Sequence, residues 1–166
     1  MRVLGVDPGL SRCGVGLIEG PPARPSLVRA GVITTAPDQP IAQRLQRVHA
    51  ELSAFIAETA PDAVAVERVF FNANVRTAMG VGQAAGVVLL CAAQAGIPIT
   101  EYTPTQVKSS VAGSGTADKA QVTFMVRALL RLSEPPRPAD TADALALALC
   151  HLTHAPLAGH IKGRTT

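Results

Sequence analysis

The chain has 166 residues, of which 48% are hydrophobic, and this composition excludes intrinsic disorder and fits one compact domain. No apolar run is long enough to cross a bilayer, and the N-terminus lacks the apolar stretch and cleavage site of a signal peptide. The three cysteines, Cys13, Cys91 and Cys150, lack metal-ligand spacing, so we expect buried thiols and a cytoplasmic protein rather than a disulfide scaffold.

The formal net charge is +3, which alone fits both an ordinary soluble protein and a protein that binds nucleic acid. If four acidic residues are committed to metal ions, as argued below, 12 − 4 = 8 acidic residues face 15 basic ones over the rest of the surface. A pocket of carboxylates inside a basic surface suits a phosphodiester substrate.

The first part of the chain predicts three strands, a helix and a fourth strand. We expect strands at residues 3–7, 14–18 and 26–34, and their short connections predict an antiparallel meander. From residue 41 to residue 56 apolar side chains recur at three- and four-residue steps, which predicts an amphipathic helix. Residues 63–67 then form a short apolar strand that ends at an acid.

The middle of the chain predicts a helix, a fifth strand and a short helix. A segment rich in small residues, at about 74–95, is expected to be helical, and residues 97–102 are expected to form a strand. Thr103 followed by Pro104 is a typical helix start, and the Gly-Ser-Gly sequence at 113–115 ends that helix.

The last part of the chain predicts two more helices and a loose tail. The first starts near Asp118, and its predicted core face holds Val122, Met125, Val126, Leu129 and Leu130. The second covers about 140–151, with His151 and His154 expected at the surface near its end. We therefore predict one α/β domain over residues 1–155 and a flexible tail over 156–166.

Four acids stand out because of their positions in this pattern. Asp7 ends the first strand and Glu67 ends the fourth, so both can reach the same edge of a sheet. Asp140 and Asp143 lie three residues apart at the start of the last helix, hence on one face. Carboxylates this close repel one another unless a cation holds them, and Mg²⁺ prefers such oxygen ligands.

Each acid also has a simpler interpretation. Asp7 before Pro8 can be a turn residue, and Glu67 can be a solvated strand end. Asp140 and Asp143 can be first-turn acids favoured by the helix dipole. Only the joint pattern favours a metal site.

Four motifs, which occur in order, resemble the RuvC family of Holliday junction resolvases. GVDPG at residues 5–9, with GVG at 14–16, resembles the opening hairpin of that family, and VERVF at 66–70 resembles the segment that carries its second acid. GQAAG at 82–86 resembles its central helix, and ADTADALA at 139–146 its final acidic helix. Together these motifs extend over nearly the whole chain.

The resemblance implies an RNase H-like fold with a five-stranded mixed sheet: three antiparallel strands, then parallel strands, flanked by helices. It implies paired cutting of strands of like polarity at a four-way DNA junction, which leaves ligatable nicks in recombination and repair. Mg²⁺ is the implied cofactor, with two ions per subunit and Mn²⁺ as a substitute. The implied partners are a second copy of the chain and the RuvA and RuvB branch-migration complex.

The resemblance also implies roles for individual residues. The implied metal ligands are Asp7, Glu67 and Asp143, with Asp140 completing the site although this position varies within the family. Lys119 is implied to assist catalysis. The implied DNA contacts are Phe70, Phe71, Arg76, Lys108 and Lys119, with Phe70 favoured over Phe71 as the ring that unstacks bases.

Three glycines in the second predicted helix give a separate indication of how it packs. Gly80, Gly82 and Gly86 each cost about 1 kcal/mol relative to Ala in a helix. Close approach of another helix in a two-fold dimer would offset that cost, and so would tight packing on the chain's own sheet.

Three other functions remain open from the sequence. An actin-like ATPase also joins two strands by an Asp- and Gly-containing loop, but such an enzyme needs a second lobe for which 166 residues leave no room. A DNA-binding module without catalysis would leave the acids without a role. The same fold could also cut RNA–DNA hybrids or another branched structure.

Overall fold

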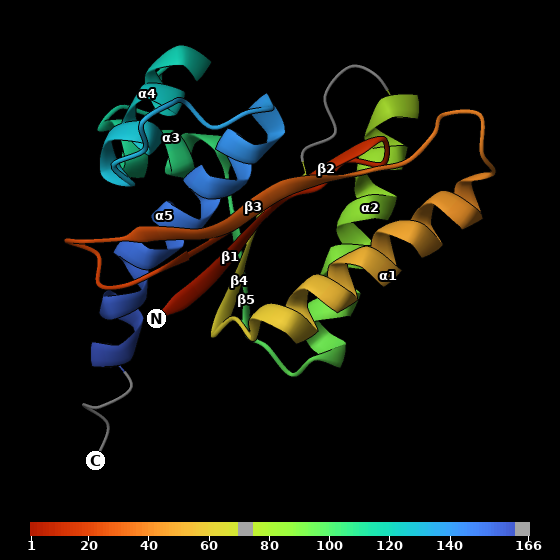
Figure 1. Ribbon diagram of the computed structural model, residues 1–166, viewed down its shortest axis with the longest axis horizontal. Coiled ribbons are helices and arrows are strands. Elements are labelled where there is room, and N and C mark those ends of the chain that lie inside the picture. Colours follow the sequence, from red (N-terminus) through yellow and green to blue (C-terminus); the bar gives the residue numbers. More distant parts are fainter. Residues whose placement is uncertain (70–74, 162–166) are drawn as a thin grey trace.

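The computed structural model describes residues 1–69 and 75–161, and it describes side chains over residues 1–69 and 78–155. Its centre is a five-stranded sheet with the order β3-β2-β1-β4-β5 (Figure 1). The strands are β1 (Arg2–Asp7), β2 (Arg12–Glu19), β3 (Ser26–Thr34), β4 (Ala63–Glu67) and β5 (Ile99–Tyr102).

The first three strands form an antiparallel meander, and β4 and β5 add to it in parallel, as predicted. In the parallel pair of β1 and β4, Val6 lies opposite Val66, and Glu67 of β4 lies opposite Tyr102 of β5. Asp7 and Glu67, each one residue further along its strand, therefore emerge at the same edge of the sheet.

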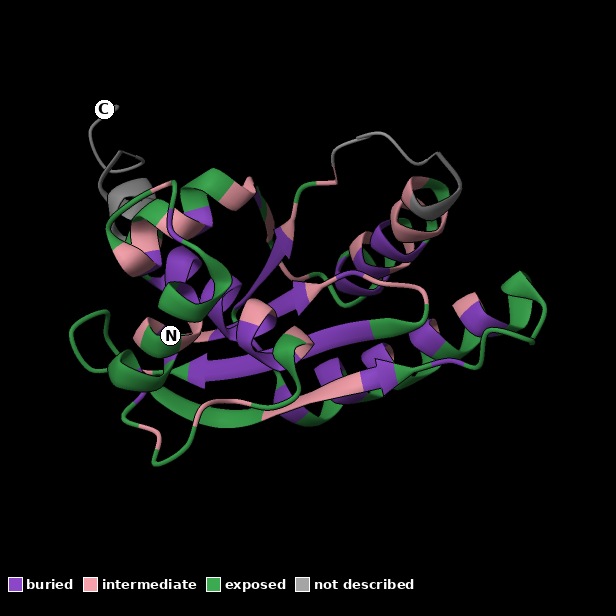
Figure 2. Cartoon of the chain, turned by 90° about the horizontal axis from the view of Figure 1, so that it is seen from above, coloured by how far each residue is buried: buried purple, intermediate pink, exposed green. Residues whose placement is uncertain are grey.

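Helices cover both faces of the sheet (Figure 1). One face carries α1 (Ile41–Thr59) and α2 (Val75–Gln94), and the other carries α3 (Pro104–Ala112), α4 (Lys119–Leu129) and α5 (Ala139–Ile161). Two hydrophobic clusters result, one on each face. The central strands β1, β2 and β4 are largely buried between them (Figure 2), which explains why β1 and β4 are continuous apolar runs rather than alternating ones.

The helix α5 lies unusually close to β1 and β2 because glycines replace side chains at the contact. A Cβ atom on Gly5 would lie 1.9 Å from the backbone oxygen of Ala144, and one on Gly14 would lie 2.2 Å from that of Asp140. At Gly16 the nearest atoms belong to Leu145 of the same helix. These glycines bring the start of α5 against the strand edge that carries Asp7.

The predicted helix starts in the middle of the chain are confirmed. Thr103 caps α3 in a reciprocal capping box with Gln106, and Asp118 caps α4 in the same way with Gln121. Gly113 ends α3 in the left-handed conformation, with φ of 76°. All three cysteines are free and buried, as expected.

Three expectations about the C-terminal part are wrong. The last helix does not end near residue 151 but continues to Ile161, so Pro156 costs the helix one hydrogen bond without ending it. His151 is therefore internal to α5, and its side chain is only 8% exposed because it packs against Tyr102. Leu129, predicted on the core face of α4, is 36% exposed at its last turn, whereas Leu130 is buried as predicted.

Over the described residues, no helix combines the length and the apolar character that a membrane span requires.

Candidate active site

Three acids and two lysines from five different elements meet around one cavity of about 290 Å³. Asp7 and Glu67 come from the ends of β1 and β4, and Asp143 comes from the first turns of α5. The lysines are Lys108 of α3 and Lys119 at the start of α4. The structure thus brings together five of the residues that the sequence singled out.

Two carboxyl groups of the cavity, those of Asp7 and Glu67, resist ionisation. The pKa of Asp7 is raised from 3.8 to about 7, first by burial and then by the charges of Glu67, Asp143 and Asp140, in that order of effect. Burial, followed by the charge of Asp143, likewise raises the pKa of Glu67. Buried like charges of this kind are costly unless a cation compensates them.

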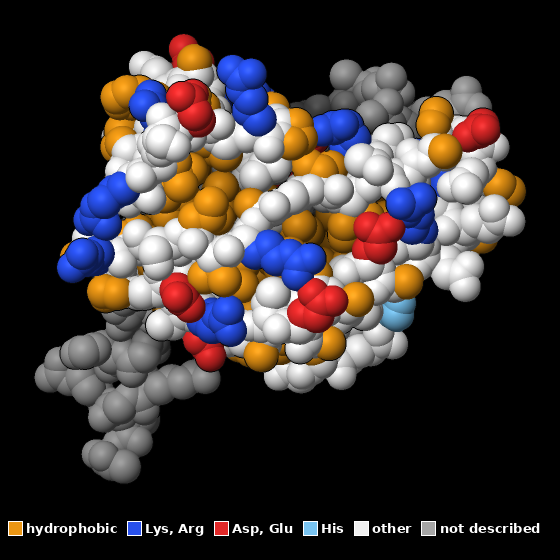
Figure 3. Space-filling model, in the orientation of Figure 1, with side chains coloured by type: hydrophobic (Ala, Val, Ile, Leu, Met, Phe, Trp, Pro, Cys, Tyr) orange, Lys and Arg blue, Asp and Glu red, His pale blue; other side chains and the backbone are white. Residues whose placement is uncertain are grey.

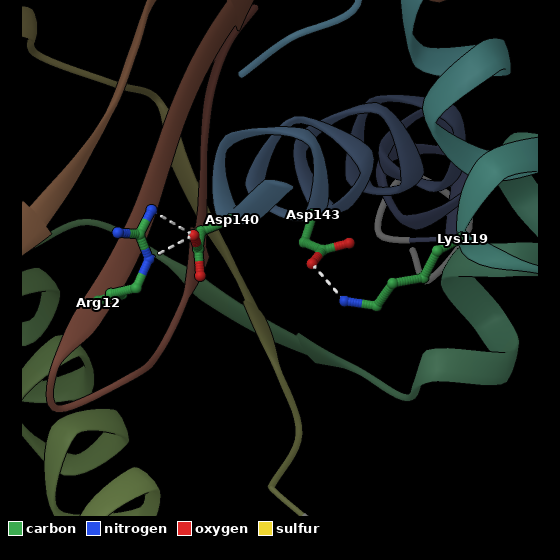
Figure 4. A network of polar contacts seen from close by, with 4 residues as sticks. All are labelled: Arg12, Lys119, Asp140 and Asp143. Atoms are coloured by element: carbon green, nitrogen blue, oxygen red, sulfur yellow. Dashed lines mark hydrogen bonds and ion pairs between the residues drawn. The ribbon is translucent and has the colours of Figure 1, made fainter. Parts of the chain in front are cut away.

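Lys119 is the cation nearest to these acids. Its Nζ atom donates a hydrogen bond to Oδ2 of Asp143 at 3.0 Å, and this hydrogen bond raises the pKa of the lysine (Figure 4). The side chain of Lys119 is 81% exposed, so it can leave Asp143 and reach a bound ligand without a large desolvation cost.

Asp140 faces away from Asp143 although both lie on α5. Its Oδ2 atom accepts from Nε of Arg12 and lies 2.8 Å from Nη2 of the same side chain (Figure 4). Figure 4 shows the two α5 carboxylates turned toward cations on opposite sides. Asp140 does not line the cavity, so the structure brings Asp7, Glu67 and Asp143 together but leaves Asp140 beside them.

The donor set at the cavity fits a hard divalent cation. Its acidic members are all carboxylates without His or Cys, and oxygen-only ligation is what Mg²⁺ and Mn²⁺ favour. Within the described part of the chain, no three such side chains converge closely enough to hold an ion as they stand. Asp143 is instead paired with Lys119, and Asp140 with Arg12.

Two arginines near the site were missed in the sequence. Arg12 holds Asp140, and nothing in the sequence pattern distinguished it from other exposed arginines. Arg44 is only 9% exposed and donates from Nε to Thr35 and from Nη2 to Ser11, in the turn that follows Asp7. A signal existed for Arg44, since it shares the apolar face of α1 with Val48 and Leu52.

Other predicted DNA contacts are not tested. Phe70 and Phe71 lie outside the described residues, and so does the side chain of Arg76 in α2. They remain predictions.

The sheet order and the acidic cavity together define the RNase H-like class of nucleases and resolvases. The fold is similar to that of the yeast mitochondrial Holliday junction resolvase Ydc2, with a TM-score of 0.64 over 97% of this chain and 83% of the other. At 13% identity, this likeness concerns the fold alone.

Proteins with higher sequence identity to this chain identify its family within this class. The family model described as crossover junction endodeoxyribonuclease RuvC matches residues 3–151. The relative from Salinispora arenicola (strain CNS-205) with that name is 61% identical over 92% of this chain and 87% of its own length. T. thermophilus RuvC, solved in complex with a Holliday junction substrate, is 41% identical, with a TM-score of 0.91 over 95% of this chain and 96% of the other. The chain belongs to the RuvC family of crossover junction endodeoxyribonucleases.

Proposed function

We propose that this protein resolves four-way DNA junctions by metal-dependent hydrolysis of two strands of like polarity, leaving nicks that a ligase can seal. The observation that carries the proposal is the cavity in which Asp7, Glu67 and Asp143 meet. Family membership and the solved complex of the T. thermophilus relative support the substrate. Recombination and DNA repair are the processes that such an activity serves.

Asp7, Glu67 and Asp143 would hold the ions, which we propose to be two Mg²⁺ per subunit with Mn²⁺ as a substitute. Bound there, the ions would supply an activated water and stabilise the leaving 3′-oxygen. The buried position of Asp7 strengthens its interaction with a cation because water screens it poorly. Asp140 can become a metal ligand only if its ion pair with Arg12 breaks.

The lysines of the cavity have roles that do not depend on ligation. Lys119, once released from Asp143, can neutralise charge that develops on the phosphate during cleavage. Lys108 faces the same cavity, where its charge lowers the pKa of Glu67 and can position a phosphate of the bound strand. For Phe70, Phe71 and Arg76 we propose the junction contacts that the family resemblance implies.

The exposed face of α2 supports a homodimer. Met79 is 58% exposed and Leu90 is 49% exposed, and the spacing of three to four residues places Gly82 and Gly86 on the helix face between them. A Cβ atom on Gly82 or Gly86 would meet nothing within 4 Å, so the alternative of tight packing on the chain's own sheet does not explain these two glycines. Only Gly80 has a neighbour, the side chain of Leu10 at 3.5 Å.

A two-fold pairing of α2 would bury this small-residue face and give two active sites for a junction of near two-fold symmetry. We further propose that the dimer works with the RuvA and RuvB branch-migration complex, which rests on family membership alone.

The test is cleavage of a labelled synthetic four-way junction with and without Mg²⁺, beside a linear duplex of matched sequence and an RNA–DNA hybrid. Paired, Mg²⁺-dependent nicks confined to the junction are the expected result. If the protein cuts the RNA–DNA hybrid and leaves the junction intact, the hybrid and not the junction is its substrate. Tight junction binding without cutting at any Mg²⁺ or Mn²⁺ concentration would favour a binding module.

A further inference from the structure

Phe124 is an unusually exposed aromatic side chain. At 64% it has the largest exposed fraction of the large hydrophobic residues in the described part of the chain. It lies in the middle of α4, whose opposite side packs into the core through Val122 and Val126. The position is therefore not a frayed end, and no contact among the described residues explains why an aromatic ring is placed there.

A groove of about 430 Å³ runs beside this ring and adjoins the candidate active site. It is lined by Phe124, Arg127 and Pro135, and also by Lys119 and Asp143. The last two residues line the acidic cavity as well. Their ion pair is thus shared by the cavity and the groove, and a strand that passes through the cavity on this side enters the groove.

Basic side chains flank the ring along the helix. Lys119 lies five residues before Phe124, and Arg127 lies three residues after it. Arg127 donates from Nε to the carbonyl oxygen of Leu132 and from Nη2 to that of Ser133, which holds its guanidinium in place at the groove. No carboxylate of the described residues pairs with Arg127. Figure 3 shows hydrophobic side chains at the surface over the α3–α4 end of the molecule, with Lys and Arg side chains beside them.

We propose that this face of α4 binds the DNA strand next to the cut phosphate, with the ring of Phe124 against a base and Arg127 on a backbone phosphate. The inference rests on the proposed function, since it is the cavity that holds the cut phosphate. An exposed ring with basic side chains on both sides matches single-stranded or unpaired nucleotides, whose bases stack on aromatic side chains while their phosphates meet basic ones. The strand is the favoured occupant because the groove adjoins the acidic cavity and shares Lys119 and Asp143 with it.

The chain contains no Trp, so Phe124→Trp introduces a unique fluorescent reporter at this position. We would make it in the full-length Asp7→Asn protein and titrate it with a synthetic four-way junction. Stacking on a base is expected to cause a saturable loss of tryptophan emission. The matched control is Val28→Trp on β3, a position 38% exposed and remote from the cavity, whose emission is expected to stay constant.

A second variant measures the contribution to binding. In the same background, Phe124→Ala is expected to weaken junction binding about tenfold, because one base–aromatic stack is worth about 1–3 kcal/mol and 1.4 kcal/mol is a factor of ten. Phe124→Tyr, which keeps the ring, is expected to bind as the parent does. Circular dichroism confirms that each variant is folded.

Unchanged emission of the Phe124→Trp protein, equal quenching at both reporter positions, or junction binding unaffected by Phe124→Ala would each overturn the proposal. These results leave the proposed function intact if the wild-type protein still cuts the junction. A wild-type protein that neither binds nor cuts the junction would instead overturn the proposed function, so the two failures can be told apart.

Discussion

The two faces of the sheet are packed in different ways. Toward α1 and α2 the strands present large side chains, including Leu4, Leu17 and Val66, which meet Val48 and Leu52 in a conventional core. Toward α5 the same strands present glycines, and the helix lies directly on their backbone. The first face can lose a methyl group and still keep its shape, whereas the second has no room for one to be added.

Because of this difference, one face mainly stabilises the fold and the other mainly positions the acids of the cavity. The face toward α1 and α2 buries apolar area, which stabilises the fold in proportion to that area. The glycine-lined face sets the distance between α5 and β1, and so it sets where Asp143 stands relative to Asp7. Substitutions on the first face should therefore change the free energy of unfolding, and substitutions on the second face should also change the rate of cleavage.

The largest effect is expected at the cavity between the two faces. Asp7→Asn should reduce junction cleavage by about a thousandfold or more, because a lost metal ligand removes several kcal/mol of charge stabilisation and each 1.36 kcal/mol is tenfold in rate. Junction binding should stay within about threefold of wild type, since basic side chains provide most of it. Single-turnover cleavage and fluorescence anisotropy measure the two quantities. Cleavage at an unchanged rate would remove Asp7 from the site.

The same variant should be more stable than wild type in metal-free buffer at high pH. The fold raises the pKa of Asp7 from 3.8 to about 7, so the native state holds the proton more tightly than the unfolded state does. The wild-type protein therefore loses stability as pH rises from 4 to 8, by at most roughly 4 kcal/mol from this group. Asp7→Asn removes that loss. Urea unfolding in EDTA should give near-equal stabilities for the wild type and Asp7→Asn at pH 4, and a higher stability for Asp7→Asn at pH 8. A variant that is less stable than the wild type at pH 8 would contradict the burial of the Asp7 charge.

Gly14→Ala should damage both stability and cleavage. The added methyl group would lie 2.2 Å from the backbone oxygen of Asp140, so the start of α5 must move. We expect a loss of about 3 kcal/mol of unfolding free energy, and a loss of cleavage per folded molecule of at least about tenfold. The control is Gly31→Ala on β3, where a Cβ atom meets nothing within 4 Å and both quantities should be unchanged. Equal behaviour of the two variants would mean that α5 is not held by close backbone contact.

Leu52→Ala should damage stability alone. Leu52 is fully buried between α1 and the sheet, and such truncations cost about 2–5 kcal/mol. Cleavage per folded molecule should remain within about twofold of wild type, because no atom of the cavity moves. Chemical denaturation combined with active-site titration separates the two effects. A large loss of turnover by fully folded Leu52→Ala would show that the two faces are not independent.

Lys119→Gln is expected to have the smallest effect on stability of these substitutions, and a smaller effect on cleavage than Asp7→Asn. We expect the cleavage rate to fall by about 10- to 100-fold. This loss is smaller than that expected for the metal ligand Asp7, because the Lys119 side chain is exposed and water screens its charge. Stability should hardly change, since an exposed ion pair contributes little. Lys119→Arg, which keeps the charge, should recover part of the rate. No recovery by arginine together with a loss of folding would indicate a structural role.

Most of the architecture could be predicted from the sequence because local signals agree with the tertiary structure. The runs before Asp7 and Glu67 are buried on both faces and hence continuous in hydrophobicity. The starts of α3 and α4 carry capping boxes that act within four residues. The cavity acids were recognisable because strand ends and a helix start placed them together.

The remainder depends on contacts between distant segments, which local patterns do not report. The direction of Asp140 depends on Arg12, 128 residues away. The internal position of His151 depends on Tyr102, whose hydroxyl lies 3.0 Å from its Nδ1 atom. The helix α5 continues to Ile161, beyond the end predicted near residue 151, because no local pattern marks its last turns.

The most direct test of the central claim is the anomalous scattering of Mn²⁺ in crystals of the wild-type protein grown with that ion. The account predicts a peak coordinated by Asp7, Glu67 and Asp143, accompanied by release of Lys119 from Asp143. A peak elsewhere, or none at these carboxylates at saturating Mn²⁺, would contradict a metal centre in the cavity.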